Sequence, residues 1–97
     1  MTDDRTARRV KVRGIVQGVG FRPFIFQLAE NCGLFGHVAN TSSGVDIHVE
    51  GDPARIEDFV AAIGAQAPPL AQITAIETRR REPGHFSDFP IIDSRRD

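Results

Sequence analysis

The stretch VQGVGFRPF, residues 16–24, joins an alternating segment of the chain to a helical one. Gly18 and Gly20 can take positive φ or let a ligand approach the backbone closely. Pro23 suits the first turn of a helix, because its fixed φ fits there and its missing N–H is not needed. Arg22 adds a permanent charge on a planar fork that suits two phosphate oxygens. The stretch therefore predicts a strand, a loop and a helix, with the N–H groups at the helix start available to an anion.

Apolar residues on both sides of this loop follow regular periods. Before it, three valines share one face of a half-buried strand and three cations the other: Val10, Val12, Val16 and Arg9, Lys11, Arg13. After it, apolar residues recur at helical spacing: Phe24, Ile25, Leu28, Ala29 and Cys32. Gly33 is suited to end this helix.

The next part of the chain predicts two strands joined by a turn. Residues 34–40 form the second strand, and TSSG at 41–44 forms the turn. In residues 45–50 of the third strand, apolar and polar side chains alternate. This alternation predicts that Asp46 and His48 point toward solvent.

The second helix has the clearest signals. Asp52 can cap it, Pro53 occupies its first position, and apolar residues recur at 56, 59, 60 and 63. A fourth strand is expected from about Ile73 to Thr78. Residues 86–92 predict a short edge strand, where Pro90 is tolerated.

This order of elements is βαββαβ with a fifth strand, which amounts to two split βαβ units. In each unit the outer strands run parallel, and the third strand fits between them in the opposite direction. Two strand spacings, roughly 10 Å, then separate the 17–22 loop from Asn40. Two segments far apart in the sequence are therefore expected to meet at one edge of the sheet.

Length and composition predict a single domain and give no indication that it binds membranes or nucleic acids. The chain has 97 residues, a net charge of −1 and one cysteine. We expect a single domain with a core of about 8–92 and frayed tails at 1–6 and 93–97. No long apolar run or signal peptide is present, so a cytoplasmic monomer without nucleic-acid or membrane partners is expected.

The predicted edge offers anion binding and little other chemistry. Asn40 could orient a water there, although an Asn beside a turn more often bonds its own backbone. A plain tight turn with a surface arginine is the alternative interpretation of the loop. No G-K-[ST] sequence follows the loop, Cys32 lies too late in the helix for a thiol nucleophile, and the three histidines are scattered. No metal or cofactor is expected.

Such a pocket suits a substrate that already carries a good leaving group. Hydrolysis of an acyl phosphate needs the phosphoryl group held, its developing charge stabilised and a water placed in line. A phosphate oxygen of the substrate could take the proton of this water. The absence of an evident base is consistent with this chemistry.

Two segments resemble the signature motifs of the acylphosphatase family: GIVQGVGFR at 14–22 and GHVANTSSG at 36–44. The resemblance covers about residues 8–92 and implies an α+β, ferredoxin-like sandwich with an antiparallel sheet of four or five strands and two helices on one face. It implies that Arg22 binds phosphate and Asn40 orients the water. The phosphate cradle would be formed by the amides of Gln17, Gly18, Val19, Gly20, Phe21 and Arg22. His37 departs from the tryptophan that many members carry.

Two shorter segments, RPF at 22–24 and PPLAQI at 68–73, resemble the N-terminal acylphosphatase domain of HypF-type carbamoyltransferases. That family makes ligands of nickel–iron hydrogenase centres from carbamoyl phosphate. The resemblance implies metal-independent hydrolysis of carbamoyl phosphate, an acyl phosphate, and downstream domains as partners. The chain would be an excised domain or a free-standing general acylphosphatase.

Two functions of other classes remain open. A binding module would hold a phosphate-bearing ligand at the same loop without chemistry. RNA binding on the open sheet face is poorly supported, because the chain has no Tyr or Trp and no aromatic-rich basic motif.

Overall fold

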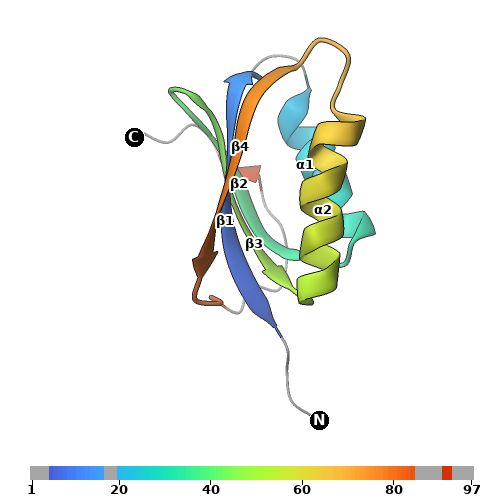
Figure 1. The fold of residues 1–97 in the computed structure, drawn as a ribbon, viewed down its shortest axis with the longest axis vertical. Coiled ribbons are helices and arrows are strands. Elements are labelled where there is room, and N and C mark those ends of the chain that lie inside the picture. Colours follow the sequence, from blue (N-terminus) through green and yellow to red (C-terminus); the bar gives the residue numbers. More distant parts are fainter. Residues whose placement is uncertain (1–4, 17–19, 85–90, 93–97) are drawn as a thin grey trace.

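The computed structural model describes residues 5–16, 20–84 and 91–92. Both helices lie on one side of the sheet (Figure 1). The elements in chain order are β1 (Thr6–Ile15), α1 (Phe21–Asn31), β2 (Phe35–Thr41), β3 (Gly44–Gly51), α2 (Pro53–Gln66), β4 (Gln72–Arg81) and β5 (Ile91–Ile92). This is the predicted order of an α+β, ferredoxin-like fold.

The strands form one five-stranded sheet in the order β4-β1-β3-β2-β5. β3 lies between β1 and β2 and is antiparallel to both, with Val10 opposite Ile47 and Val38 opposite the same residue. β4 is antiparallel to β1. The expected split βαβ arrangement is confirmed. The sheet is not wholly antiparallel, because the short β5 pairs parallel with β2. Residues 85–90 of the expected edge strand lie outside the described residues.

The hydrophobic core lies between the helices and the sheet. The apolar side chains that alternate along β1, β2 and β3 face α1 and α2, as their spacing predicts. The buried members of this core are Val10, Val12, Val16, Phe21, Ile25, Leu28, Ala29, Leu34, Val38, Val45, Ile47, Val49, Ile56, Phe59 and Ile63. No helix in the described part of the chain is long and apolar enough to cross a membrane.

Local signals set the ends of both helices. Pro23 lies in the first turn of α1, and Gly33 follows the helix with φ 66°. The N–H of Gly33 donates to the carbonyl of Glu30 (3.0 Å), which closes the last turn. At α2, the Asp52 carboxylate accepts a hydrogen bond from the N–H of Ala54 (2.8 Å), as expected of a cap.

Two strand boundaries differ from the prediction. β1 begins at Thr6, and the side chain of Arg5 lies over the ring of Phe35 (4.9 Å). The expected frayed tail therefore holds at most for residues 1–4, which lie outside the described residues. β4 continues to Arg81, because it pairs with β1 as far as Ala7 opposite Arg81. The polar end of β4 carried no apolar signal that could predict this extension.

The open face of β3 also differs from the prediction. Asp46 and His48 do lie on the polar face, yet both are buried, and Glu50 is fully buried. Asp46 is covered by Arg9, whose guanidinium donates two hydrogen bonds to its carboxylate (2.9 and 2.7 Å). Alternation alone placed these side chains in solvent because it takes no account of long side chains on neighbouring strands.

Glu50 is the centre of a buried polar cluster at the far end of this face. One carboxylate oxygen lies 2.6 Å from His48 Nε2 and accepts the N–H of Gly84 (2.7 Å). The other oxygen pairs with Arg5 (3.3 Å). Arg81 Nη1 lies 3.5 Å from His48 Nδ1. The cluster joins the start of β1, the end of β3 and the chain after β4.

Candidate functional site

The end of β1 and the turn between β2 and β3 meet at one edge of the sheet. The N–H of Gly14 donates to the carbonyl of Ser43 (3.2 Å). Residues 14–16 and 42–44 line a hollow of about 250 Å³ there. Gly14 has φ 134°, and a Cβ at this position would lie 2.0 Å from the carbonyl oxygen of Gln72. The topology predicted that the 17–22 loop and Asn40 meet at this edge, whereas the backbone contact between Gly14 and Ser43 was not predicted.

The N-terminus of α1 lies just beyond this edge. Gly20 is its N-cap in the left-handed region (φ 77°, ψ 21°), and no side chain among the described residues caps the helix. The N–H of Phe24 donates to the carbonyl of Gly20 (3.2 Å), which is the first bond of the helix. Because the first N–H groups of a helix have no partner within it, this end favours an anion.

Arg22 lies in the first turn of α1 and is half-buried. Its neighbour Phe21 is buried in the core, and the rings of Phe21 and Phe24 pack 5.5 Å apart. This packing fixes the turn that carries the guanidinium. Gln17, Gly18 and Val19 of the expected phosphate cradle lie outside the described residues.

Asn40 is the last residue but one of β2 and pairs opposite Val45. Val38 and Val45 belong to the core, so alternation places Asn40 on the face that carries the helices. Its side-chain oxygen, Oδ1, is buried and makes no hydrogen bond to the part of the chain that the structure describes. A buried carbonyl oxygen normally accepts a hydrogen bond from a protein group or a water. Asn40 Oδ1 is therefore available to accept one from a water.

The topology brings Arg22 and Asn40 to the same face and the same edge. α1 starts directly after β1, packs against β2, and β2 ends beside Asn40. The start of α1 thus contributes a cation and a helix N-terminus, and β2 contributes a buried amide oxygen. A helix N-terminus that carries a cation favours an anion, and a buried carbonyl oxygen accepts a hydrogen bond from a donor beside it.

The remaining reactive groups lie elsewhere. Cys32 follows the last turn of α1, and burial raises the pKa of its thiol, with Asp58 adding to the rise and Arg55 opposing it. The rings of His37 and His48 stack 5.5 Å apart on the open face. His85 lies outside the described residues. Among the residues described, no three His, Cys, Asp or Glu side chains gather as metal ligands would.

Comparison with known proteins gives the family. The sequence profile described as Acylphosphatase matches residues 8–91. The acylphosphatase of Thermotoga petrophila is 40% identical over 86 residues, which cover 88% of this chain and 94% of that protein. The chain belongs to the acylphosphatase family.

Two further relatives are much longer proteins. Carbamoyltransferase HypF2 of Cupriavidus necator is 44% identical over 95% of this chain, which spans 12% of the length of that protein. A crystal structure of full-length HypF in the phosphate- and nucleotide-bound form superposes with a TM-score of 0.96 at 42% identity, covering 100% of this chain and 13% of that one. The resemblance to the N-terminal region of HypF carbamoyltransferases is confirmed.

Proposed function

We propose that this chain hydrolyses the carboxyl–phosphate bond of acyl phosphates without a metal. One observation carries the proposal: the buried Oδ1 of Asn40, which accepts no hydrogen bond from the described residues, lies on the sheet face and edge where α1 begins. Placing a water against this oxygen would satisfy it and hold the water beside a bound phosphoryl group.

In the proposed complex, the phosphoryl group binds at the N-terminus of α1. Amides of Gln17, Gly18, Val19, Gly20, Phe21 and Arg22 donate to its oxygens, and the helix dipole favours its negative charge. The guanidinium of Arg22 neutralises charge that develops on these oxygens during the reaction. Both contributions grow as the transition state forms, so they speed the chemical step.

The reaction needs no nucleophile from the protein. A water held by Asn40 attacks phosphorus, the bond from phosphorus to the acyl oxygen breaks, and the carboxylate leaves with the electron pair. The water loses one proton to a phosphate oxygen of the substrate, so the products are a carboxylate and inorganic phosphate. Arg22 thus acts as the phosphate-binding residue and Asn40 as the water-orienting residue.

We further propose carbamoyl phosphate as the physiological substrate, which would release carbamate and phosphate. The support is the similarity to HypF carbamoyltransferases, of which this chain spans about an eighth. The chain would then be the N-terminal domain of a larger cytoplasmic protein of nickel–iron hydrogenase maturation, with the other domains as its partners. As a domain by itself, with a core of about 8–92, it would be monomeric.

The test is release of phosphate from carbamoyl phosphate and benzoyl phosphate in the presence of EDTA. Arg22→Ala should raise KM and lower kcat, with a loss in kcat/KM of about 100-fold or more, because it removes the cation that binds the phosphoryl group. Asn40→Ala should leave KM nearly unchanged and lower kcat by about 100-fold, because the water loses its orientation.

Arg55→Ala is a matched control, since Arg55 is an exposed arginine on α2 whose removal should leave both constants unchanged. Equal effects of the Arg22 and Asn40 variants on KM and kcat would contradict their separate roles. Binding of phosphate without hydrolysis would instead indicate a phosphate-binding module. A preference for benzoyl phosphate would indicate a general acylphosphatase.

A further inference from the structure

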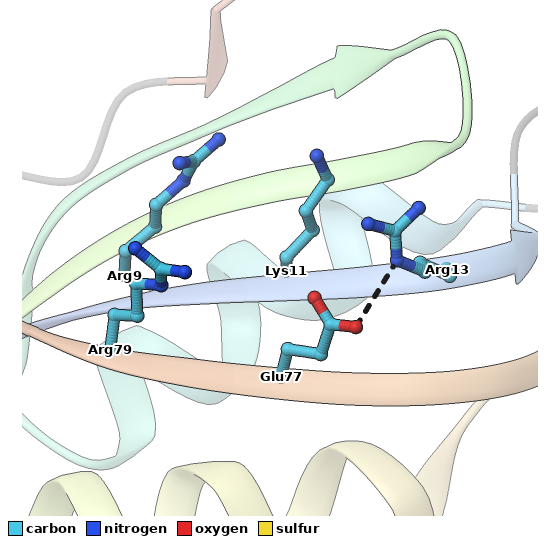
Figure 2. Close-up of a pocket in the computed structure, with 5 residues that line it drawn as sticks. All are labelled: Arg9, Lys11, Arg13, Glu77 and Arg79. Carbon is cyan, nitrogen blue, oxygen red and sulfur yellow. Dashed lines mark ion pairs between the residues drawn. The ribbon is translucent and has the colours of Figure 1, made fainter.

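The open face of the sheet carries a basic groove, lined by side chains from β1 and β4. Figure 2 shows all five on the same side of the two strands: Arg9, Lys11, Arg13, Glu77 and Arg79. The hollow between them measures about 220 Å³. Residues Val10 and Val12, which alternate with the β1 cations, face the helices instead. The groove is therefore on the opposite side of the sheet from Arg22 and Asn40.

The groove holds more positive charge than its carboxylates neutralise. Arg9 is paired with Asp46 (2.7 Å), and Arg13 with Glu77 (3.4 Å). Lys11 stands directly opposite Glu77 in the sheet, yet it forms no ion pair or hydrogen bond with the described residues.

Arg79 likewise has no such partner in the described part of the chain, and it stands directly opposite Arg9. Like charges in directly opposed positions of a sheet are destabilising. An anion placed between these two strands would offset this repulsion. The positions of Lys11 and Arg79 thus leave two positive charges available to a ligand.

The cations of β1 are arranged in a line. Arg9, Lys11 and Arg13 occupy every second position of one strand, so their Cα atoms follow one another at about 6.6 to 6.8 Å. A second polypeptide in extended conformation carries its alternate side chains at the same interval. Carboxylates at every second residue of such a segment would therefore recur at the spacing of these cations, of which Arg9 and Arg13 are already paired with carboxylates and Lys11 is not paired with any of the described residues. A single phosphate group would reach only part of the line.

We propose that this groove binds an acidic polypeptide segment in extended conformation, with carboxylates facing Lys11, Arg79 and the neighbouring arginines. Charge complementarity provides the attraction, and the strand spacing sets the register. Single-stranded RNA is disfavoured, because none of the described side chains that line the groove is aromatic and could stack on a base. This surface does not depend on the proposed hydrolysis.

The test is fluorescence anisotropy of a labelled peptide in which Glu alternates with Ser over about eight residues. Binding should be measurable at about 50 mM salt and should weaken steeply at about 200 mM, because exposed charges are screened. The double variant Lys11→Gln, Arg79→Gln should weaken binding by about three- to tenfold, since each exposed ion pair contributes modestly. A peptide with Gln in place of Glu should not bind.

Two matched controls make the result specific to the groove. Arg80→Gln removes the same charge from the neighbouring position of β4, which faces the other side of the sheet, and it should leave the affinity unchanged. A peptide with the same residues arranged as one block of Glu and one block of Ser should bind about twofold or more weakly.

Four results would overturn the proposal: no binding of the alternating peptide at low salt, equal binding by the double variant, an equal loss with Arg80→Gln, or tighter binding of a single-stranded RNA of the same charge. Hydrolysis of acyl phosphates should be the same in the wild type and the double variant. Equal hydrolysis also shows that the double variant is folded, so a loss of peptide binding then reports on the groove itself.

Discussion

Both faces of β3 are buried, but by different means. Val45, Ile47 and Val49 face the helices and are covered by apolar side chains. Asp46, His48 and Glu50 face the open side, where no helix lies, and are covered by charged side chains and by backbone. Apolar burial needs side chains of the right volume, whereas polar burial needs a partner for each group. The two faces should therefore respond differently to substitution.

The largest effect is expected on the apolar face. Ile47→Ala should lower the free energy of unfolding by about 3 kcal/mol, because it removes buried methylene groups and leaves a cavity beneath the helices. Urea denaturation measures this change. Ile15→Ala, at a position 62% exposed, is the control and should stay within about 0.5 kcal/mol of the wild type. Equal losses for both variants would mean that the helix layer does not bury β3 tightly.

A somewhat smaller effect is expected on the polar face. Glu50→Gln should lower the free energy of unfolding by about 2 kcal/mol, because the half-buried Arg5 and the buried His48 lose a charged acceptor. Glu77→Gln is the matched control, since this exposed carboxylate pairs only at the surface and its loss should cost less than about 0.5 kcal/mol. If the two variants were equally stable, the buried contacts of Glu50 would contribute no more to the free energy of unfolding than the exposed ion pair of Glu77.

The smallest effect is expected for the titration of the Cys32 thiol, which lies at the end of α1. Burial raises the pKa of the Cys32 thiol, with a further contribution from Asp58. The folded chain then holds this proton more tightly than the unfolded chain, so the free energy of unfolding should fall as the pH rises through the pKa of the folded thiol. Alkylation by iodoacetamide should require a higher pH in the folded protein than in urea.

Asp58→Asn should shift this alkylation profile to lower pH, because it removes a negative charge near the thiol. Glu57→Gln changes the charge of the neighbouring residue of α2, which does not act on Cys32, and should leave the profile in place. Identical profiles for folded and unfolded protein would show that the thiol is not buried enough to disfavour its charged form.

The helices, strands and caps were predictable because their signals are local. Pro23, Gly33 and Asp52 act within one turn of the helix ends that they define. The alternating apolar residues of β1 and β3 identified the buried face, and the order of elements places Asn40 at the edge of the sheet where the chain leaves β1 for α1.

The polar cluster was not predictable, because its contacts join residues far apart in the sequence. Glu50 meets Arg5 and Gly84, and Asp46 meets Arg9, so no window of neighbouring residues contains the pattern. The burial of the Asn40 side-chain oxygen could not be predicted for the same reason, since it depends on which of the described residues pack around it and whether any of them donates a hydrogen bond. Alternation predicts a face, and only the structure gives its burial.

Gly14 and Gly20 restrict evolutionary change for different reasons. At position 14 the Cβ of any other residue would collide with the backbone of β4, so only glycine fits there. At position 20 an added Cβ would meet none of the described residues within 4 Å, and there the positive φ is what disfavours other residues. Asparagine tolerates that conformation at small cost. Replacement of Gly20 by asparagine should therefore be tolerated during evolution of this fold, whereas replacement of Gly14 should not.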